Sequence, residues 1–192
     1  MLSSMTAAPE KHLTPDEYLS FERAAEAKHE YYDGQIFAMA GCNRRHDTIA
    51  TWLLAALARA LETGPCQPFS SDMRVHIPAT GLYTYTDGLV ACAPAFTDER
   101  EDTLTNPVAI FEILSDSTEA YDRGKKFENY RTIRTLQDYV LFSQHKILVE
   151  HFTRQPDGRW LLEELRAGDV LRLSSAAIEI PVQDLYRRVF ES

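Results

Sequence analysis

The sequence predicts one mixed α/β domain, and three observations support this fold class. The chain has 192 residues, which is enough for one substantial core and too few for two. Segments with helical and strand-like spacing of apolar residues follow the order helix, sheet, helix, sheet, so one core needs both. Residues 108–114 are almost continuously apolar, as expected for a central strand covered on both faces. We expect residues 13–192 to form this single domain, after a flexible tail over residues 1–12.

The N-terminal part of the domain should be a helix followed by a hairpin. Thr14 begins a capping box, with proline at the next position and Glu17 three residues after the threonine. The helix should extend to about residue 28. Residues 29–39 are predicted to form a β-hairpin, because Asp33-Gly34 is a two-residue turn in which both positions favour positive φ.

The remaining elements follow from apolar spacing and from turn residues. A second helix is predicted over residues 45–62, before a Gly-Pro pair that stops it. Two β segments, residues 67–77 and 83–93, should pair antiparallel across a short link. We further predict a loop over residues 97–106 and a helix over residues 121–134. Three strands should follow, at residues 138–142, 146–152 and 160–165, and a terminal helix should begin near Val182.

Composition favours a cytoplasmic globular protein. Apolar residues make up 44% of the chain and charged residues 26%, and no run approaches the roughly 18 to 20 apolar residues of a membrane helix. The first residues do not have the form of a signal peptide. The three cysteines, Cys42, Cys66 and Cys92, show no C-x-x-C spacing and favour reduced thiols in a core over disulfides or a zinc site.

Two carboxylates lie in strand-like segments where a charge is costly. Glu112 interrupts the apolar run 108–114, and Asp87 lies within residues 83–90. A salt bridge or strand end for Glu112, and a turn at Asp87-Gly88, are the structural alternatives. At about 4 Å and an effective dielectric near 20, two such charges repel by roughly 4 kcal/mol. A hard divalent cation would offset this repulsion, and Mg²⁺ needs only two carboxylates because it keeps several waters.

Three segments resemble one known protein family. They are K-x-E-Y-Y-D-G at residues 28–34, N-P-V-A-I-F-E-I-L-S-D-S-T at residues 106–118 and Y-D-R-G-K-K-F-E-N-Y-R at residues 121–131. The chain is similar to the Uma-two family of restriction-endonuclease-like proteins, a branch of the PD-(D/E)xK nuclease superfamily, over about residues 13–186. The resemblance implies a restriction-endonuclease-like three-layer α/β/α sandwich, with a mixed central β-sheet and a divalent-metal site at one edge.

The resemblance also implies which residues do the chemistry. Asp87 matches the strand aspartate of the family and Glu112 matches the carboxylate of the (D/E)xK element. Glu30 matches an acidic residue of the N-terminal element. Leu114 occupies the position of the superfamily lysine, and in this branch the lysine comes from the following helix as Lys126.

These matches predict a Mg²⁺-dependent endonuclease acting on DNA. Asp87 and Glu112 would bind Mg²⁺, or Mn²⁺ in its place, and Glu30 could take a second ligand position. Lys126 would orient the attacking water and stabilise the developing negative charge.

Three further residues are candidates for substrate contact or for support of the site. They are His46 at the start of the second helix, Asp72 and Arg123. Each has a structural alternative: helix capping, a surface position and a local ion pair, respectively.

Other function classes are excluded or remain as rivals. The chain has no G-x-S-x-G elbow, P-loop or G-x-G-x-x-G motif, which argues against serine hydrolases, NTPases and Rossmann enzymes. The net charge of −9 opposes DNA binding, and Thr86 and Asp116 stand where the family usually has proline. A catalytically inactive nuclease fold that acts in binding is therefore the main rival, and a small-substrate phosphatase is a weaker one. A homodimer is expected if both DNA strands are cut.

Overall fold

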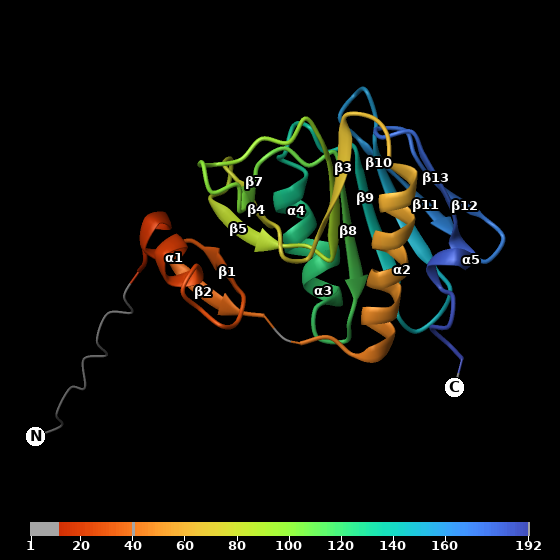
Figure 1. Cartoon of the computed structure of the whole chain (residues 1–192), viewed down its shortest axis with the longest axis horizontal. Helices are drawn as coiled ribbons and strands as arrows, with labels where there is room; N and C mark the ends of the chain where they lie inside the picture. The colour runs from red at the N-terminus through yellow and green to blue at the C-terminus, as the bar shows by residue number, and fades with distance from the viewer. Residues whose placement is uncertain (1–11, 40, 192) are drawn as a thin grey trace, which may run out of the picture.

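The core of the molecule is a six-stranded mixed sheet (Figure 1). The computed structural model of the chain describes residues 12–39 and 41–191. Within the sheet, one parallel pair joins strands that otherwise run antiparallel. The strand order is β11 (Trp160–Leu165), β10 (Val149–Arg154), β9 (Asp138–Ser143), β8 (Ala109–Leu114), β6 (Gly88–Cys92) and β3 (Cys66–Ser70), and β8 and β9 form the parallel pair.

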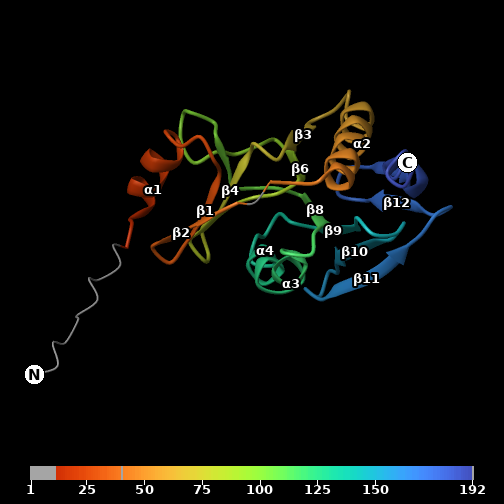
Figure 2. The same cartoon turned by 90° about the horizontal axis from the view of Figure 1, so that it is seen from below.

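Helices cover both faces of this sheet, as Figure 2 shows from below. One face packs against α2 (Arg44–Ala60), through Ile49, Leu53 and Leu57, which are fully buried. The small sheet of β12 (Val170–Leu173) and β13 (Ile178–Pro181) and the short helix α5 (Val182–Leu185) complete this layer. The other face packs against α3 (Glu119–Tyr121), a π-helical turn η1 (Asp122–Lys126) and α4 (Phe127–Tyr130). The expected three-layer α/β/α sandwich with a mixed central sheet is therefore confirmed.

A second sheet joins the N-terminal hairpin to the domain. Its order is β2 (Gln35–Ala38), β1 (His29–Tyr32), β5 (Leu82–Tyr85), β4 (Arg74–Ile77) and β7 (Thr103–Leu104), and α1 (Pro15–Glu22) packs on it. The predicted antiparallel pairing of residues 67–77 with 83–93 is correct, but each segment contributes one strand to each sheet. β3 pairs with β6 in the central sheet, and β4 pairs with β5 in the second sheet. The change of sheet occurs at residues 71–73 and 86–87, which lie outside the strands.

The bend at Asp87 has a local cause. The Asp87 N–H donates to Phe111 O at 3.2 Å, and its carboxylate accepts from Ile113 N at 2.7 Å. The side chain thus accepts a hydrogen bond from a β8 N–H that a backbone carbonyl of the neighbouring strand would otherwise accept. The carboxylate is consequently fixed at the junction of the two sheets.

Several predicted boundaries were wrong. The first helix ends at Glu22 rather than near residue 28. The Glu22 carboxylate accepts hydrogen bonds from His29 N and Tyr85 OH, both at 2.9 Å, so the chain reverses after Glu22 to bring His29 next to it. The helix expected over residues 121–134 is shorter and contains the π-helical turn. The predicted loop 97–106 contains β7, and β12 and β13 were not predicted at all.

The expectation for the cysteines was also wrong. Cys66 and Cys92 are Cα partners on β3 and β6 and form a disulfide, and Cys42 is exposed rather than in a core. Strand pairing brings together two cysteines that are 26 residues apart, which motif spacing does not reveal.

Two further expectations concern the tail and membranes. Apart from His12, the tail expected over residues 1–12 lies outside the described residues. None of the helices within residues 12–39 and 41–191 has both the length and the apolar character needed to cross a bilayer.

Candidate functional site

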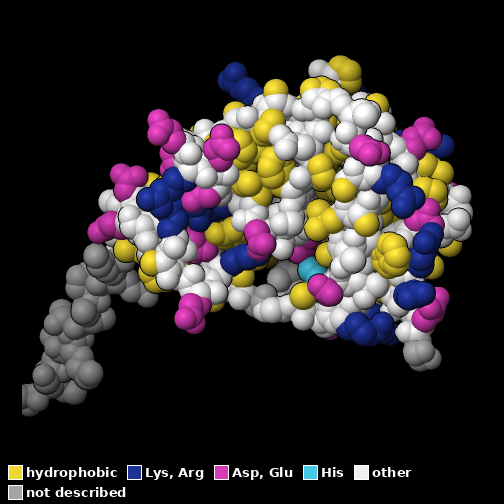
Figure 3. Space-filling model, in the orientation of Figure 1, with side chains coloured by type: hydrophobic (Ala, Val, Ile, Leu, Met, Phe, Trp, Pro, Cys, Tyr) yellow, Lys and Arg dark blue, Asp and Glu magenta, His cyan; other side chains and the backbone are white. Residues whose placement is uncertain are grey.

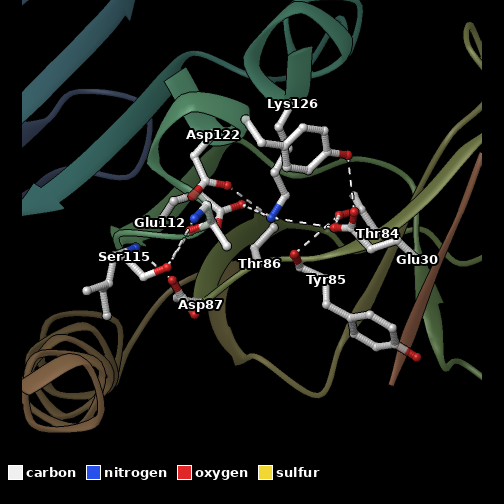
Figure 4. Close-up of polar contacts among 12 residues, drawn as sticks. Glu30, Thr84, Tyr85, Thr86, Asp87, Glu112, Ser115, Asp122 and Lys126 are labelled. Atoms are coloured by element: carbon white, nitrogen blue, oxygen red, sulfur yellow. Dashed lines mark hydrogen bonds and ion pairs between the residues drawn. The ribbon is translucent and has the colours of Figure 1, made fainter. Parts of the chain in front are cut away.

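Three of the four residues predicted from sequence, Glu30, Glu112 and Lys126, meet at the junction of the two sheets, with the Lys126 ammonium between the two carboxylates (Figure 4). The fourth, Asp87, lies near enough for its charge to act on Glu112. Lys126 Nζ lies 2.9 Å from Glu112 Oε1 and 3.6 Å from Glu30 Oε1. It also lies 3.6 Å from Asp122 Oδ1. The side chains of Lys126, Glu112 and Asp122 are only 4–6% exposed, so these ions interact with little screening by water.

Glu30 brings the N-terminal hairpin into the site. It lies on β1, and its carboxylate accepts hydrogen bonds from the Thr84 hydroxyl on β5 and from Tyr121 OH, the latter at 3.1 Å. These two donors come from the neighbouring strand and from the helical layer opposite. Glu30 is thereby held with one oxygen towards Lys126.

Asp87 directly precedes β6, and Glu112 lies on the neighbouring strand β8. Gly88 of β6 is the partner of Phe111 on β8, so the same antiparallel register places Asp87 opposite Glu112. Residues directly opposite each other project on the same face of a sheet. Figure 4 shows Asp87 below Glu112, with a dashed line from Lys126 to Glu112 and none from Lys126 to Asp87.

The π-helical turn presents two charged side chains inward. Its end residues, Asp122 and Lys126, are buried and form an i,i+4 ion pair. Tyr130, four residues further, donates its hydroxyl to Glu112 Oε1 at 2.8 Å. π-Helices occur mostly as single turns inside α-helices, frequently at functional sites. Here one stripe of the helix supplies an acid, an amine and a phenol to the same cluster.

The cluster contains more potential negative than positive charge. The carboxyl groups of Glu30, Glu112 and Asp122 surround the Lys126 ammonium, and Asp87 is near enough for its charge to act on Glu112. Full ionisation would therefore place four negative charges against this one ammonium group. Burial raises the pKa of Glu112 well above its ordinary value, and the charges of Asp122 and Asp87 add to this effect against the attraction of Lys126. Burial likewise raises the pKa of Asp122. Burial acts to lower the pKa of Lys126, but Glu112, Glu30 and Asp122 outweigh it and raise that pKa well above the usual range.

A hard divalent cation fits this donor chemistry. Within residues 12–39 and 41–191, no group of three or more His, Cys, Asp or Glu side chains is arranged as a ready-made metal site. Mg²⁺ does not require such a cage, because one or two carboxylates and several waters complete its octahedral shell. Asp87 and Glu112 offer oxygen donors in a region with excess negative charge, and a bound cation would relieve the cost of ionising Glu112.

Of the three additional candidates, only His46 contacts the site. Its Nε2 lies 3.2 Å from Asp87 Oδ2, and its Nδ1 is buried without a hydrogen-bond partner among the described residues. Burial acts to lower the pKa of His46, but the hydrogen bond and charge of Asp87, with smaller effects of Asp47 and Asp122, raise it overall.

Asp72 and Arg123 lie outside the cluster. Asp72 is in the exposed turn between β3 and β4, where Lys28 Nζ lies 2.6 Å from its carboxylate. Arg123 is on the outer side of the π-helical turn and pairs with Glu119 and Glu150 at 2.8 and 2.5 Å. The structural alternatives given for them from sequence therefore apply: Asp72 has a surface position, and Arg123 forms local ion pairs.

Sequence reasoning missed several residues of the site. Asp122 was not among the predicted site residues, yet it is buried against Lys126. The available signal was spacing: Asp122, Lys126 and Tyr130 recur every four residues and therefore share a helix face. No comparable signal marked Thr84 or Tyr121, since their role depends on where β1 lies in the fold.

Replacing Asp122 by Asn should stabilise the chain at neutral pH. The pKa of Asp122 is raised from its ordinary value of 3.8, so the folded state retains this proton more strongly than the unfolded state does. Stability is therefore lost as the pH rises from about 3.8 through the folded pKa, and Asn removes that loss. We expect the melting temperature of Asp122→Asn to exceed that of the wild type at pH 7, by about 2–4 °C for each kcal/mol gained.

Calorimetry at two pH values tests this expectation. The difference between variant and wild type should vanish near pH 3, where both states carry the proton. Glu163→Gln, which removes a charge from an exposed position on β11, is the control and should change little. A lower melting temperature for Asp122→Asn at pH 7 would show that the ion pair with Lys126 outweighs the burial of the acid.

Comparison with known proteins agrees with this fold. The model of the family Uma2, described as "Putative restriction endonuclease", matches residues 15–183. The Synechocystis protein slr1290 is 38% identical over 189 residues, covering 97% of this chain and 98% of that protein. The Synechocystis protein sll1609 is 39% identical over 162 residues, covering 84% and 92% respectively.

A solved structure shows the same fold. The crystal structure of a protein from Anabaena variabilis, described as "a putative nuclease belonging to DUF820", superimposes with a TM-score of 0.74, at 17% identity, over 93% of this chain and 99% of that one. This similarity supports the architecture, and the family model covers most of the sequence, including every residue of the Lys126 cluster. The chain therefore belongs to the Uma2 family, described as "Putative restriction endonuclease".

Proposed function

We propose that the chain is a Mg²⁺-dependent endonuclease that hydrolyses phosphodiester bonds in DNA. The observation that carries this proposal is the buried cluster in which Asp87 and Glu112 share one region with the Lys126 ammonium. A pair of acidic oxygen donors next to a fixed cation is the set of groups that metal-dependent hydrolysis requires. Membership of the Uma2 family and the fold shared with the Anabaena protein support the nuclease class.

The residues of the chain divide the chemistry among them. Asp87 and Glu112 would hold Mg²⁺, or Mn²⁺ in its place, which when bound supplies positive charge for the phosphate and lowers the pKa of water. Lys126 donates a hydrogen bond to the attacking water and stabilises negative charge as it develops. Glu30 and Asp122 keep the ammonium charged and in position, because their carboxylates raise its pKa.

Two donors fix the carboxylates for this role. The Ile113 N–H holds one oxygen of Asp87, and Tyr130 OH holds one oxygen of Glu112. Each carboxylate is thus oriented by a group that does not itself take part in the reaction. Such supporting contacts commonly change metal affinity or activity 10- to 100-fold when they are removed.

Metal titration followed by a cleavage assay tests the proposed function. A cation that binds only the folded state at 100 times its Kd should add about 2.7 kcal/mol, or roughly 5–10 °C in melting temperature. We expect this shift with Mg²⁺ or Mn²⁺, together with cleavage of duplex DNA that EDTA abolishes. Cleavage of mononucleotides alone would assign a phosphatase instead. The absence of both the shift and cleavage would favour the non-enzymatic module.

A further inference from the structure

A second polar site lies beside His46. Residues at the start of α2 and residues that follow β9 enclose a shallow cavity of about 300 Å³, lined by Asn43, Arg44, Arg45, Gln144 and His145. We propose that this cavity binds a phosphate group of the nucleic-acid strand, next to the phosphate at the Lys126 cluster. The inference rests on the proposed function, which it extends by a substrate subsite.

The two arginines in this cavity are not neutralised. Neither Arg44 nor Arg45 forms an ion pair with an acidic side chain of the described residues. Arg44 donates only long hydrogen bonds, of 3.4–3.5 Å, to backbone carbonyls near the C-terminus. The Arg45 guanidinium lies 5.3 Å from the centre of the Phe190 ring, which orients it without cancelling its charge.

Free positive charge is notable on so acidic a chain. The net charge is −9, and buried Arg74, like Arg23, is matched with the carboxylate of Asp102. Figure 3 shows Lys and Arg side chains gathered at the lower right, over the start of α2 and the C-terminal segment. The planar guanidinium fork suits phosphate oxygens, so a pair of unneutralised arginines at a cavity indicates an anionic ligand.

Gln144 supplies a neutral hydrogen-bond donor to the same cavity. Its side chain is in a residue only 3% exposed, and it lines the cavity. The Gln144 Oε1 accepts from Asn43 Nδ2 at 2.7 Å, whereas its amide nitrogen has no acceptor among the described residues. The Gln144 amide nitrogen is not one of the buried polar atoms that lack a partner, so it is open to solvent or to a ligand. A phosphate oxygen in the cavity could accept from it.

The position of the cavity links it to the Lys126 cluster. His46 follows Arg45 directly in α2, and its Nε2 lies 3.2 Å from Asp87 Oδ2. Asn43 caps the same helix by accepting a hydrogen bond from His46 N at 3.1 Å. One rigid helix end therefore carries both the cavity residues and the side chain that touches Asp87. A polynucleotide, which carries a phosphate at every nucleotide, can occupy both places at once.

Three acidic residues of the described part of the chain lie near the cavity without lining it: Asp116 beside His145, Asp47 in the first turn of α2, and Glu191, whose backbone carbonyl accepts from Arg44. Asp116 Oδ1 is 2.8 Å from His145 Nε2, and both side chains are more than half exposed. This carboxylate faces His145 and is not among the residues that line the cavity. The arginines and the Gln144 amide are accordingly the groups that should decide anion binding.

Titration with inorganic phosphate tests the cavity directly. We expect saturable shifts of the Gln144 side-chain amide resonances in NMR spectra of the wild-type chain, and none in the double variant Arg44→Gln, Arg45→Gln. Arg59→Gln removes the same charge from the far end of α2 and should leave the shifts unchanged. Failure of the wild-type amide to respond, or an equal response in the double variant, would overturn the proposal.

Salt dependence of DNA binding tests whether the ligand is a strand phosphate. With a labelled duplex in EDTA, loss of one phosphate contact should reduce the slope of log K against log salt by about 0.9 in magnitude. The double variant and Gln144→Glu should both bind the duplex about 10-fold more weakly, whereas Arg59→Gln should match the wild type. Phosphate shifts without any change in DNA binding would mean an adventitious anion site and would contradict the proposal.

The two assays separate this inference from the proposed function. Phosphate titration and duplex binding do not require catalysis, so an inactive protein that passes both still has the subsite. Conversely, the protein could cleave DNA in a Mg²⁺-dependent way while its Gln144 amide resonances do not respond to phosphate. That result would support the endonuclease proposal and would contradict the phosphate subsite.

Discussion

Asp87→Asn and Glu112→Gln are each expected to lower metal-dependent DNA cleavage by about 10³-fold or more. Both substitutions keep the shape of the side chain, and the amide oxygen can still accept from Ile113 N or Tyr130 OH. What they remove is the charge that Mg²⁺ needs in its oxygen ligands. The change in melting temperature on addition of Mg²⁺ should therefore disappear along with cleavage.

The chain offers a matched control for this experiment. Asp72→Asn removes an acid that is exposed in the turn between β3 and β4, away from the Lys126 cluster. Cleavage by this variant should equal that of the wild type. Full cleavage by Asp87→Asn or Glu112→Gln would instead exclude the proposed metal ligands, whatever the family of the chain.

Lys126→Met should have two large effects, on stability and on catalysis. Its ammonium is the central cation of Glu30, Glu112 and Asp122, and removing one partner of a buried ion pair costs about 3–5 kcal/mol. For a chain of this size, that corresponds to a fall of about 6–20 °C in melting temperature. Cleavage should be lost even at saturating metal, because no group remains to orient the water.

Lys125→Met is the matched control, since Lys125 is the adjacent residue and its exposed ammonium pairs only with Glu128 at 3.1 Å among the described residues. Exposed pairs of this kind contribute little to stability, because water screens the two charges. We also expect Mg²⁺ to raise the melting temperature of Lys126→Met more than that of the wild type, because the ion replaces a missing positive charge. Equal behaviour of the two lysine variants would refute the central role of Lys126.

Features coded by short stretches of sequence were predictable. The capping box at Thr14 forms as expected, and Asp33 and Gly34 both adopt positive φ in the hairpin turn. Glu112 was identified because a single charge inside an apolar strand demands an explanation, and the structure gives it Lys126 and Tyr130 as partners. Each of these signals lies within a few residues.

Features that depend on distant segments were not predictable. The bend at Asp87 depends on a hydrogen bond from Ile113, and the end of α1 depends on one from Tyr85. The pairing of Cys66 with Cys92 follows from strand register. In all three cases the partner is at least 26 residues away, so no local pattern could show it.

The passage of two β segments from one sheet to the other has a mechanical consequence. Glu30 belongs to the second sheet, Glu112 to the first, and Asp87 stands at the crease where the two meet. A tilt of one sheet against the other would change the spacing between the acids without breaking either sheet. A substrate that contacts both sheets would therefore fix the angle between them, and with it the distances among the carboxyl groups of Glu30, Asp87 and Glu112.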